Sequence, residues 1–237
     1  MKALIFDCDG VLVDTERDGH RVAFNRAFAE AGIKADWSVE LYGELLKIAG
    51  GKERMTHYFD RHGWPSGKTA ETLIPELHKR KTAVFTALIA GGSLPLRSGV
   101  TRIVDEAHAA GIRLGVCTTS DPKSIDGVLD LMGKQRKAYF EIVLAGDVVA
   151  KKKPNPEIYN LAKQRLNLDS ANCVVIEDSR NGLLAAAGAG MPCLITTSTY
   201  TLDEDFHEAA RIVPELGDAP SVRITLKDLK AIAARVA

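Results

Sequence analysis

The feature that most constrains the fold is an alternation of short apolar runs with helical patterns, most regular between residues 97 and 200. An unbroken apolar run of three or four residues is typical of a strand that is buried on both faces of a sheet. Such runs occupy residues 3–6, 114–117, 142–144, 174–176 and 193–195. Helical patterns occupy residues 100–110, 122–132, 156–166 and 182–189. This order predicts an α/β fold in which helices wrap a parallel sheet.

Residues 15–94 replace this alternation with one helical pattern after another. The expected helices cover residues 15–31, 38–48, 52–62 and 72–90, and Pro75 should interrupt the last of them or lie in its first turn. We therefore predict a core of residues 1–14 and 95–237, with a helical cap of residues 15–94 inserted after the first strand. A final helix is expected from the capping box of Thr225 and Asp228 to residue 236.

The charge balance argues against several classes of partner. The 237 residues carry 31 Lys and Arg against 31 Asp and Glu, so the formal net charge is zero. A neutral chain gives no electrostatic footprint for nucleic acid or an acidic membrane. The uncharged segment 181–202 contains glycines and Pro192, which favour a helix, a turn and a strand over a membrane span. We expect a monomer that binds neither nucleic acid nor membranes.

The cysteines leave two interpretations open. Four scattered cysteines are too few for a disulfide scaffold at this length, so a reducing compartment is expected. Cys173 and Cys193 open two strands that should be neighbours, while Cys8 and Cys117 lie beside the polar residues described next. Either pair could form a redox switch, or all four could be buried thiols that pack in the core.

Two carboxylates follow the first apolar run. Asp7 and Asp9 stand where the first strand should end, and Gly10 allows the chain to turn sharply there. In open parallel sheets, ligands bind at the carboxyl ends of the strands. Two carboxylates this close repel each other unless a cation binds between them or one holds a proton. Taken alone, the pair could also be a solvated acidic turn.

A second acidic pair follows the apolar run at residues 174–176. Glu177 and Asp178 should lie at the same edge of the sheet as Asp7 and Asp9, because parallel strands all end at that edge. Carboxylate oxygens gathered in this way suit a hard cation such as Mg²⁺, which also takes water and substrate phosphate as ligands. The two pairs together predict a magnesium site.

Two further strand ends supply groups that a phosphate requires. Thr118, Thr119 and Ser120 follow the second run just before a helix, where hydroxyl and backbone N–H groups favour an anion. Lys153 ends a run of three lysines after the third strand and could neutralise a phosphoryl oxygen. Separately, these residues could be a helix cap and a solvated loop. Together with the acidic pairs they predict a site for phosphoryl transfer.

In chain order, these motifs resemble the four motifs of the haloacid dehalogenase superfamily of phosphatases and phosphomutases. They are Asp7-x-Asp9-Gly10-Val11, Thr118, Lys153-Pro154 and Glu177-Asp178-Ser179-x-x-Gly182, and the match spans most of the chain. The resemblance implies a Rossmann-like parallel sheet core with an inserted α-helical cap. It also implies catalysis through an aspartyl-phosphate intermediate with Mg²⁺ as cofactor.

The resemblance gives each motif residue a role. Asp7 would be the nucleophile, and Asp9 would be the general acid and base. Thr118 and Lys153 would hold the transferring phosphoryl group. The implied metal ligands are Asp7, Asp9 through its backbone carbonyl, Asp178, and Glu177 directly or one layer further out.

Within this superfamily the chain resembles the β-phosphoglucomutase-like branch, and there the CbbY-like proteins of photosynthetic organisms. The similar stretches are residues 6–16, 45–55 and 145–154. This resemblance implies a phosphatase that converts xylulose 1,5-bisphosphate to xylulose 5-phosphate and so removes an inhibitor of carbon fixation. It implies the chloroplast stroma, with a transit peptide outside this sequence, or otherwise the cytoplasm. The alternatives are a phosphomutase of the β-phosphoglucomutase type and, from a different class, a non-catalytic sensor of sugar phosphates.

Further residues are expected to bind the rest of the sugar phosphate. They are Glu16, His20, Gly50, Gly51, Lys52, Arg54, Arg97, Thr119 and Ser120. The N–H groups and basic side chains of residues 50–54 could hold a second, non-reacting phosphate, or could be a flexible helix start with ordinary surface charge. Glu16 and His20 could bind sugar hydroxyls, although His20 could equally pack against the protein. Arg97 could reach the distal phosphate.

Overall fold

The computed structural model describes residues 1–48, 51–92 and 94–234. The chain divides into two compact units, which we call the sheet unit, Met1–Asp14 with Pro95–Ala237, and the helical unit, Thr15–Leu94. That the sheet unit is a catalytic core and the helical unit a cap remains a prediction. Among the described helices, none is long and apolar enough to cross a lipid bilayer.

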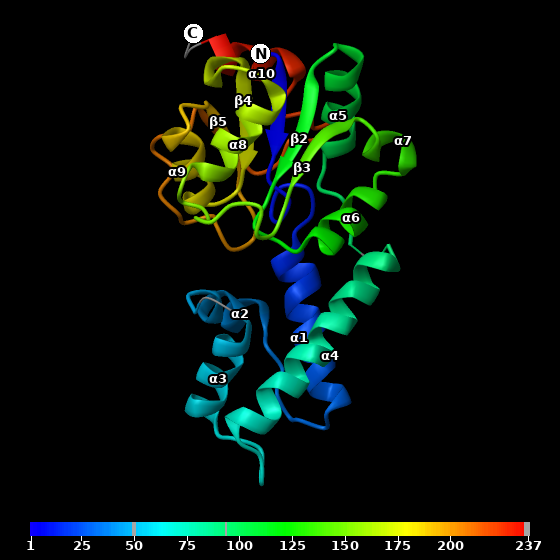
Figure 1. Cartoon of the computed structure of the whole chain (residues 1–237). Helices are drawn as coiled ribbons and strands as arrows, with labels where there is room; N and C mark the ends of the chain where they lie inside the picture. Colours follow the sequence, from blue (N-terminus) through cyan, green and yellow to red (C-terminus); the bar gives the residue numbers. More distant parts are fainter. Residues whose placement is uncertain (49–50, 93, 235–237) are drawn as a thin grey trace. The chain divides into compact units, whose positions relative to one another are not determined.

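The sheet unit contains six parallel strands in the order β3-β2-β1-β4-β5-β6 (Figure 1). The strands are β1 Ala3–Phe6, β2 Arg113–Cys117, β3 Phe140–Leu144, β4 Cys173–Glu177, β5 Cys193–Thr196 and β6 Arg211–Val213. The predicted α/β fold with a parallel sheet is confirmed. The sequence analysis missed β6, because this edge strand is short and mostly exposed and so has no unbroken apolar run.

Helices cover both faces of the sheet. In β1, Ala3 and Ile5 belong to a core cluster with residues of two helices that contact the sheet, α8 Glu157–Leu166 and α9 Arg180–Gly188. Leu4 and Phe6, which point to the opposite face by the alternation of a strand, are also fully buried. The helices of this unit are α5 Val100–Ala109, α6 Pro122–Asp130, α7 Lys134–Lys137, α8 Glu157–Leu166, α9 Arg180–Gly188 and α10 Leu226–Ala234. Helix α5 packs on β2 and helix α10 packs on β4, and the two helices also contact each other.

The helical unit is held together by buried aromatic side chains. Its elements are a π-helical turn, η1 Thr15–His20, and the α-helices α1 Arg21–Glu30, α2 Val39–Leu46, α3 Gly51–His62 and α4 Ala70–Ala90. The ring of Trp37 lies 4.7 Å from that of Phe24 and 5.0 Å from that of Phe28, measured between centroids. All three are buried, so their aromatic surface contributes to the stability of this unit.

One expected helix start needs correction, and another is confirmed. Pro75 neither interrupts α4 nor lies in its first turn, because the helix begins at Ala70 and contains Pro75 in its interior. The earlier start is stabilised by the backbone N–H of Thr69, which donates to the Thr72 hydroxyl at 3.2 Å. At the other end of the chain, the expected capping box of Thr225 and Asp228 is present, and α10 begins at Leu226, directly after Thr225. Its expected end at residue 236 lies outside the described residues.

Candidate active site

The four motifs meet at the carboxyl edge of the sheet. In the register of the central strands, Phe6 lies opposite Val116 on one side and Ile176 on the other. Asp7 directly follows β1, and its N–H donates to the carbonyl of Ile176 at 2.9 Å. By the same register Cys117 and Glu177, the last residues of β2 and β4, lie level with Asp7, and Thr118 follows Cys117 directly.

Three buried carboxylates form a cluster there. Each of Asp7, Glu177 and Asp178 offers an oxygen that lies within 4.8 Å of the other two. All three residues are at most 8% exposed. Carboxylates at this separation and burial cannot all be ionised without compensating positive charge.

Lys153 supplies part of that charge. Its ammonium group donates to Asp7 Oδ1 at 2.7 Å, to Glu177 Oε1 at 2.5 Å and to the backbone carbonyl of Cys117 at 2.9 Å. Burial alone would lower the pKa of Lys153, but the charges of Asp7 and Glu177 raise it above its usual value. Lys153 is therefore a permanent cation, although one positive charge does not balance three carboxylates.

The uncompensated negative charge is reflected in the pKa values of the carboxyl groups. Burial, together with the charges of Glu177 and Asp9, raises the pKa of Asp7 to about 8 in spite of the opposing effect of Lys153. Burial also raises the pKa of Asp178 well above its usual range, and the charges of Asp7 and Glu177 add to this. A hard divalent cation at this cluster would supply the missing charge to oxygen ligands of the kind it prefers. The donor set thus fits Mg²⁺.

Tyr159 is a member of the site that the sequence analysis missed. This residue of α8 is fully buried, and its hydroxyl donates to Glu177 Oε1 at 2.5 Å. Glu177 therefore receives hydrogen bonds from both Tyr159 and Lys153, which fix its carboxylate inside the protein. In the sequence, Tyr159 reads as one more residue on the buried face of a helix, so no signal marked it.

The residues after β2 contact Asp9 rather than the acidic cluster. The Ser120 hydroxyl donates to Asp9 Oδ2, and the Ser120 N–H donates to the Thr118 hydroxyl at 3.1 Å. Thr118 is buried, and Thr119 is exposed. The structure thus brings Thr118, Ser120 and Asp9 together, and directs the Asp9 side chain to Ser120. Asp9 is not one of the three carboxylates of the cluster.

Two motif glycines leave room for the carboxylates. Gly10 has φ +79°, and a side chain there would also collide with the carboxylate of Asp178. Gly182 lies in the first turn of α9, where a Cβ atom would collide with the carboxylate of Glu177. The spacing Glu177-x-x-x-x-Gly182 therefore has a steric reason.

Gly182→Ala should separate helix propensity from site geometry. Alanine favours a helix by about 1 kcal/mol over glycine, yet its Cβ would displace Glu177. We expect Mg²⁺ affinity or kcat to fall by about tenfold or more, as when other partners of metal ligands are lost. Calorimetric Mg²⁺ titration and phosphate release measure both quantities. The control is Gly188→Ala in the same helix, where an added Cβ meets only the ring of Pro156. Equal results for the two variants would contradict this account.

Arg54 points into the helical unit. It is buried and donates to the Tyr42 hydroxyl at 2.8 Å and to the carbonyls of Leu45 and Ile48 at 3.1 and 3.4 Å. These contacts do not support the expected role of Arg54 in binding a second phosphate. The Tyr42 hydroxyl in turn donates to Glu16 Oε2 at 2.6 Å.

Other residues expected to bind substrate lie at the start of α3. Gly51 is the first residue of this helix, and Lys52 is exposed in its first turn. Gly50 lies outside the described residues.

His20 packs inside the helical unit. Its ring lies 3.9 Å from that of Phe85, and Lys81 Nζ lies 2.9 Å from its Nδ1. Burial lowers the pKa of His20 well below its usual value, and the charges of Lys81 and Arg54 lower it further. His20 is therefore a neutral ring that accepts a hydrogen bond from Lys81. This geometry favours the packing interpretation over a contact with sugar hydroxyls.

A neutral His20 predicts loss of stability in mild acid. Below about pH 6.5 the unfolded chain takes up a proton at this histidine and the folded chain does not. The contribution of His20 to the free energy of unfolding should therefore fall as the pH falls below that value, by up to about 1.4 kcal/mol per pH unit, whereas the raised pKa values of Asp7 and Asp178 contribute in the opposite direction. Urea unfolding between about pH 8 and pH 5 measures the slope.

The matched comparison for that slope is between two substitutions in the helical unit. His20→Asn should remove the component due to His20, whereas His57→Asn on α3 should keep it. If His20→Asn unfolds with the same pH dependence as the unaltered protein, the neutral histidine is not the cause.

The side chain of Arg97 is also hydrogen-bonded to groups of the protein. Its guanidinium donates to backbone carbonyls of the sheet unit, among them those of Thr197 at 2.7 Å and Pro214 at 2.5 Å. The expected contact between Arg97 and a distal phosphate is therefore not supported.

The cysteines are all free and buried. Burial raises the pKa of Cys8, Cys117 and Cys193 well above the usual thiol value, and that of Cys173 to about 11. In the neighbouring strands β4 and β5, Cys193 lies opposite Val175 rather than Cys173. Because thiolates are disfavoured at all four positions, the arrangement favours packing over a redox switch.

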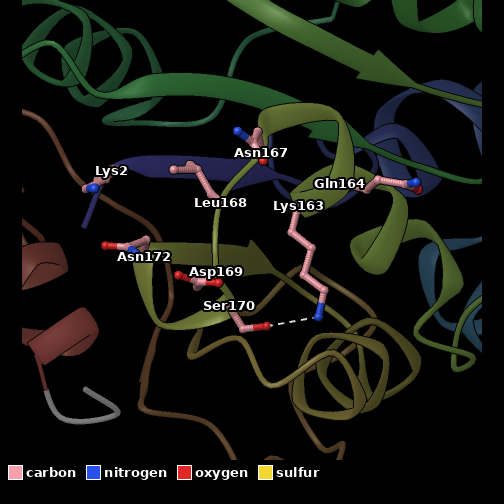
Figure 2. A pocket seen from close by; sticks show the side chains of 8 residues that line it. All are labelled: Lys2, Lys163, Gln164, Asn167, Leu168, Asp169, Ser170 and Asn172. Atoms are coloured by element: carbon pink, nitrogen blue, oxygen red, sulfur yellow. Dashed lines mark hydrogen bonds between the residues drawn. The ribbon is translucent and has the colours of Figure 1, made fainter.

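A polar pocket lies at the opposite, amino edge of the sheet, where β1 and β4 begin (Figure 2). Its lining residues are Lys2, Lys163, Gln164, Asn167, Leu168, Asp169, Ser170 and Asn172. Within it, Lys163 Nζ donates to the Ser170 hydroxyl at 3.2 Å. None of these residues belongs to the four motifs, so this pocket is separate from the candidate active site.

Comparison with known proteins identifies the family. Residues 1–190 match the haloacid dehalogenase-like hydrolases. The chain belongs to this family. A CbbY-like protein of Arabidopsis thaliana is 50% identical over 94% of this chain and 72% of that protein. The CbbY protein of Cupriavidus necator is 41% identical over 92% of this chain and 87% of that protein.

Solved structures agree with this membership. Crystal structures of CbbY from Rhodobacter sphaeroides, one in complex with phosphate and one of a mutant in complex with xylulose-(1,5)bisphosphate, are 39% identical to this chain. Each has a TM-score of 0.78 and covers 97% of this chain and 99% of the other. A phosphatase of phosphorylated carbohydrates from Thermotoga maritima is 30% identical over 81% of this chain. The predicted family is thus confirmed, and the chain is a hydrolase of phosphoric monoesters.

Proposed function

We propose that this protein is a Mg²⁺-dependent phosphatase that removes the C1 phosphate of xylulose 1,5-bisphosphate and releases xylulose 5-phosphate. The observation that carries the chemistry is the cluster of Asp7, Glu177 and Asp178 around Lys153 at the carboxyl edge of the sheet. The similarity to CbbY structures that hold phosphate and xylulose bisphosphate supports the choice of substrate. The plant relative supports a chloroplast location.

The acidic cluster would hold the cation. Asp7 and Asp178 would bind it directly, together with the backbone carbonyl of Asp9, and Glu177 would lie beside it. When bound, the cation would neutralise charge on the transferring phosphoryl group.

The side chains of this chain would carry the two chemical steps. A carboxylate oxygen of Asp7 attacks phosphorus, and the bond from phosphorus to the sugar oxygen breaks. Asp9 gives its proton to that oxygen, and then takes a proton from the water that attacks the aspartyl-phosphate. This second attack releases inorganic phosphate and restores Asp7. Lys153, 2.7 Å from Asp7 Oδ1, would hold a phosphoryl oxygen throughout.

Asp7→Asn should abolish turnover and leave the fold intact, because an amide cannot serve as the nucleophile. Loss of a nucleophile that acts with its partners costs about four orders of magnitude or more in kcat. Phosphate release and circular dichroism measure the two effects. Asp121→Asn is the control, since Asp121 is an exposed N-cap of α6 and asparagine caps equally well. Substantial phosphate release by Asp7→Asn would exclude Asp7 as the nucleophile.

The fold does not separate a phosphatase from a phosphomutase. A β-phosphoglucomutase from Clostridium difficile shares it with a TM-score of 0.71 at 21% identity. A mutase returns the phosphoryl group to a sugar, whereas a phosphatase transfers it to water.

The two reactions differ in their products, so we expect free phosphate to form in equal amount to the dephosphorylated sugar. The assay covers xylulose 1,5-bisphosphate, other pentose bisphosphates, hexose phosphates and phosphoglycolate, with xylulose 1,5-bisphosphate giving the highest kcat/KM. An isomerised sugar phosphate without free phosphate would identify a mutase. Binding of sugar phosphate without any turnover would identify a sensor.

A further inference from the structure

One guanidinium group joins three segments next to the acidic cluster. Arg97 Nη1 donates to the carbonyl of Gly10 and, at 3.2 Å, to that of Thr196, while Nη2 donates to Thr197 at 2.7 Å and Pro214 at 2.5 Å. Gly10 lies in the loop after β1, Thr196 is the last residue of β5, and Pro214 follows β6. Arg97 thereby connects the loop of the first motif to the ends of two strands.

Two of these segments touch Asp178 from different positions in the chain. Gly10 packs against the Asp178 carboxylate so closely that a side chain on Gly10 would collide with it. The Ser198 side chain, directly after Thr197, lies near the same carboxylate and interacts favourably with its charged form. Arg97 therefore holds two segments that lie against the carboxylate of Asp178.

The chemistry of arginine suits this task. A guanidinium presents five N–H donors in a rigid plane and stays charged at every relevant pH, so it can satisfy several carbonyls at once. A lysine offers three donors from a single atom and cannot span the same acceptors. Gly10 and Thr196 are buried, so carbonyls left without a partner there would be costly.

We propose that Arg97 is a positioning residue of the metal site. It fixes the loop that carries Asp9 and the carboxylate of Asp178 relative to each other, without itself contacting substrate or cation. This inference rests on the proposed function, because it assigns Asp178 to the Mg²⁺ site.

Arg97→Lys tests the inference. The Kd for Mg²⁺, measured by calorimetry without substrate, should rise by about tenfold or more, in the range seen when outer partners of metal ligands are lost. The kcat should fall by the same factor for xylulose 1,5-bisphosphate and for p-nitrophenyl phosphate, which has no second phosphate. A rise in KM for the bisphosphate alone, with an unchanged Kd for Mg²⁺, would overturn the proposal in favour of a phosphate contact. A lower Tm with an unchanged Kd would reduce Arg97 to a structural role and overturn it too.

Arg102→Lys is the matched control. Arg102 also lies in the sheet unit and donates to the carbonyls of Leu216 at 3.3 Å, Gly217 at 2.6 Å and Ile224 at 2.8 Å, none of which adjoins the acidic cluster. This variant should lose stability while its Kd for Mg²⁺ stays unchanged. If both lysine variants weaken Mg²⁺ binding equally, the effect is general destabilisation and the proposal fails.

Hydrogen exchange of the unaltered protein decides the question if Arg97→Lys does not fold. The N–H of Gly10 donates to Val13, and the N–H of Thr197 donates to Val213. If Arg97 joins their segments, both amides should exchange at similar rates and slow together when Mg²⁺ is added. Protection of one segment without the other would overturn the proposal. An unaltered protein that binds Mg²⁺ but hydrolyses neither substrate would refute the proposed function, while its Mg²⁺ titrations would still test Arg97.

Discussion

The buried ammonium of Lys153 between Asp7 and Glu177 is the interaction on which the site depends. Removing carboxylates from water is costly, and attraction to a nearby cation offsets this cost only when the geometry is close. Lys153 meets this requirement with contacts of 2.7 and 2.5 Å. It leaves Asp178 and part of the negative charge uncompensated, which is the condition that makes the cluster suitable for a divalent cation. A fully balanced cluster would be a structural ion pair with no need for a metal.

The sheet places these residues with little extra loss of conformational entropy, because the strands that carry them are already ordered. The register of the central strands brings Asp7 and Glu177 together, with Thr118 at the end of the neighbouring strand, through backbone hydrogen bonds that the fold forms in any case. Burial on both faces then fixes the strands that carry them. Gly10 and Gly182 complete the arrangement by leaving space for two carboxylates, so the glycines of the motifs follow from packing as much as from chain flexibility.

The sequence predicted the residues that act through charge better than those that act through position. Apolar runs and acidic strand ends identified the sheet and the cluster, because parallel strands place their ends together. Tyr159 and Ser198 could not be predicted in the same way. Tyr159 donates to the Glu177 carboxylate and Ser198 lies near that of Asp178, but neither stands out in the sequence among the buried or polar residues around it. The short edge strand β6 was not predicted for a related reason, since an exposed strand has no continuous apolar pattern.

Arginines show where the limits of sequence reasoning lie. A cation near a predicted phosphate site looks like a ligand, yet Arg54 and Arg97 both direct their donors to groups of the protein. The reason is physical: a guanidinium with five donors can satisfy several carbonyls where loops converge, so it stabilises irregular backbone that no ladder of hydrogen bonds supports. In the helical unit, Arg54 donates to the Tyr42 hydroxyl, which donates to Glu16, and this chain holds the Glu16 carboxylate in one orientation.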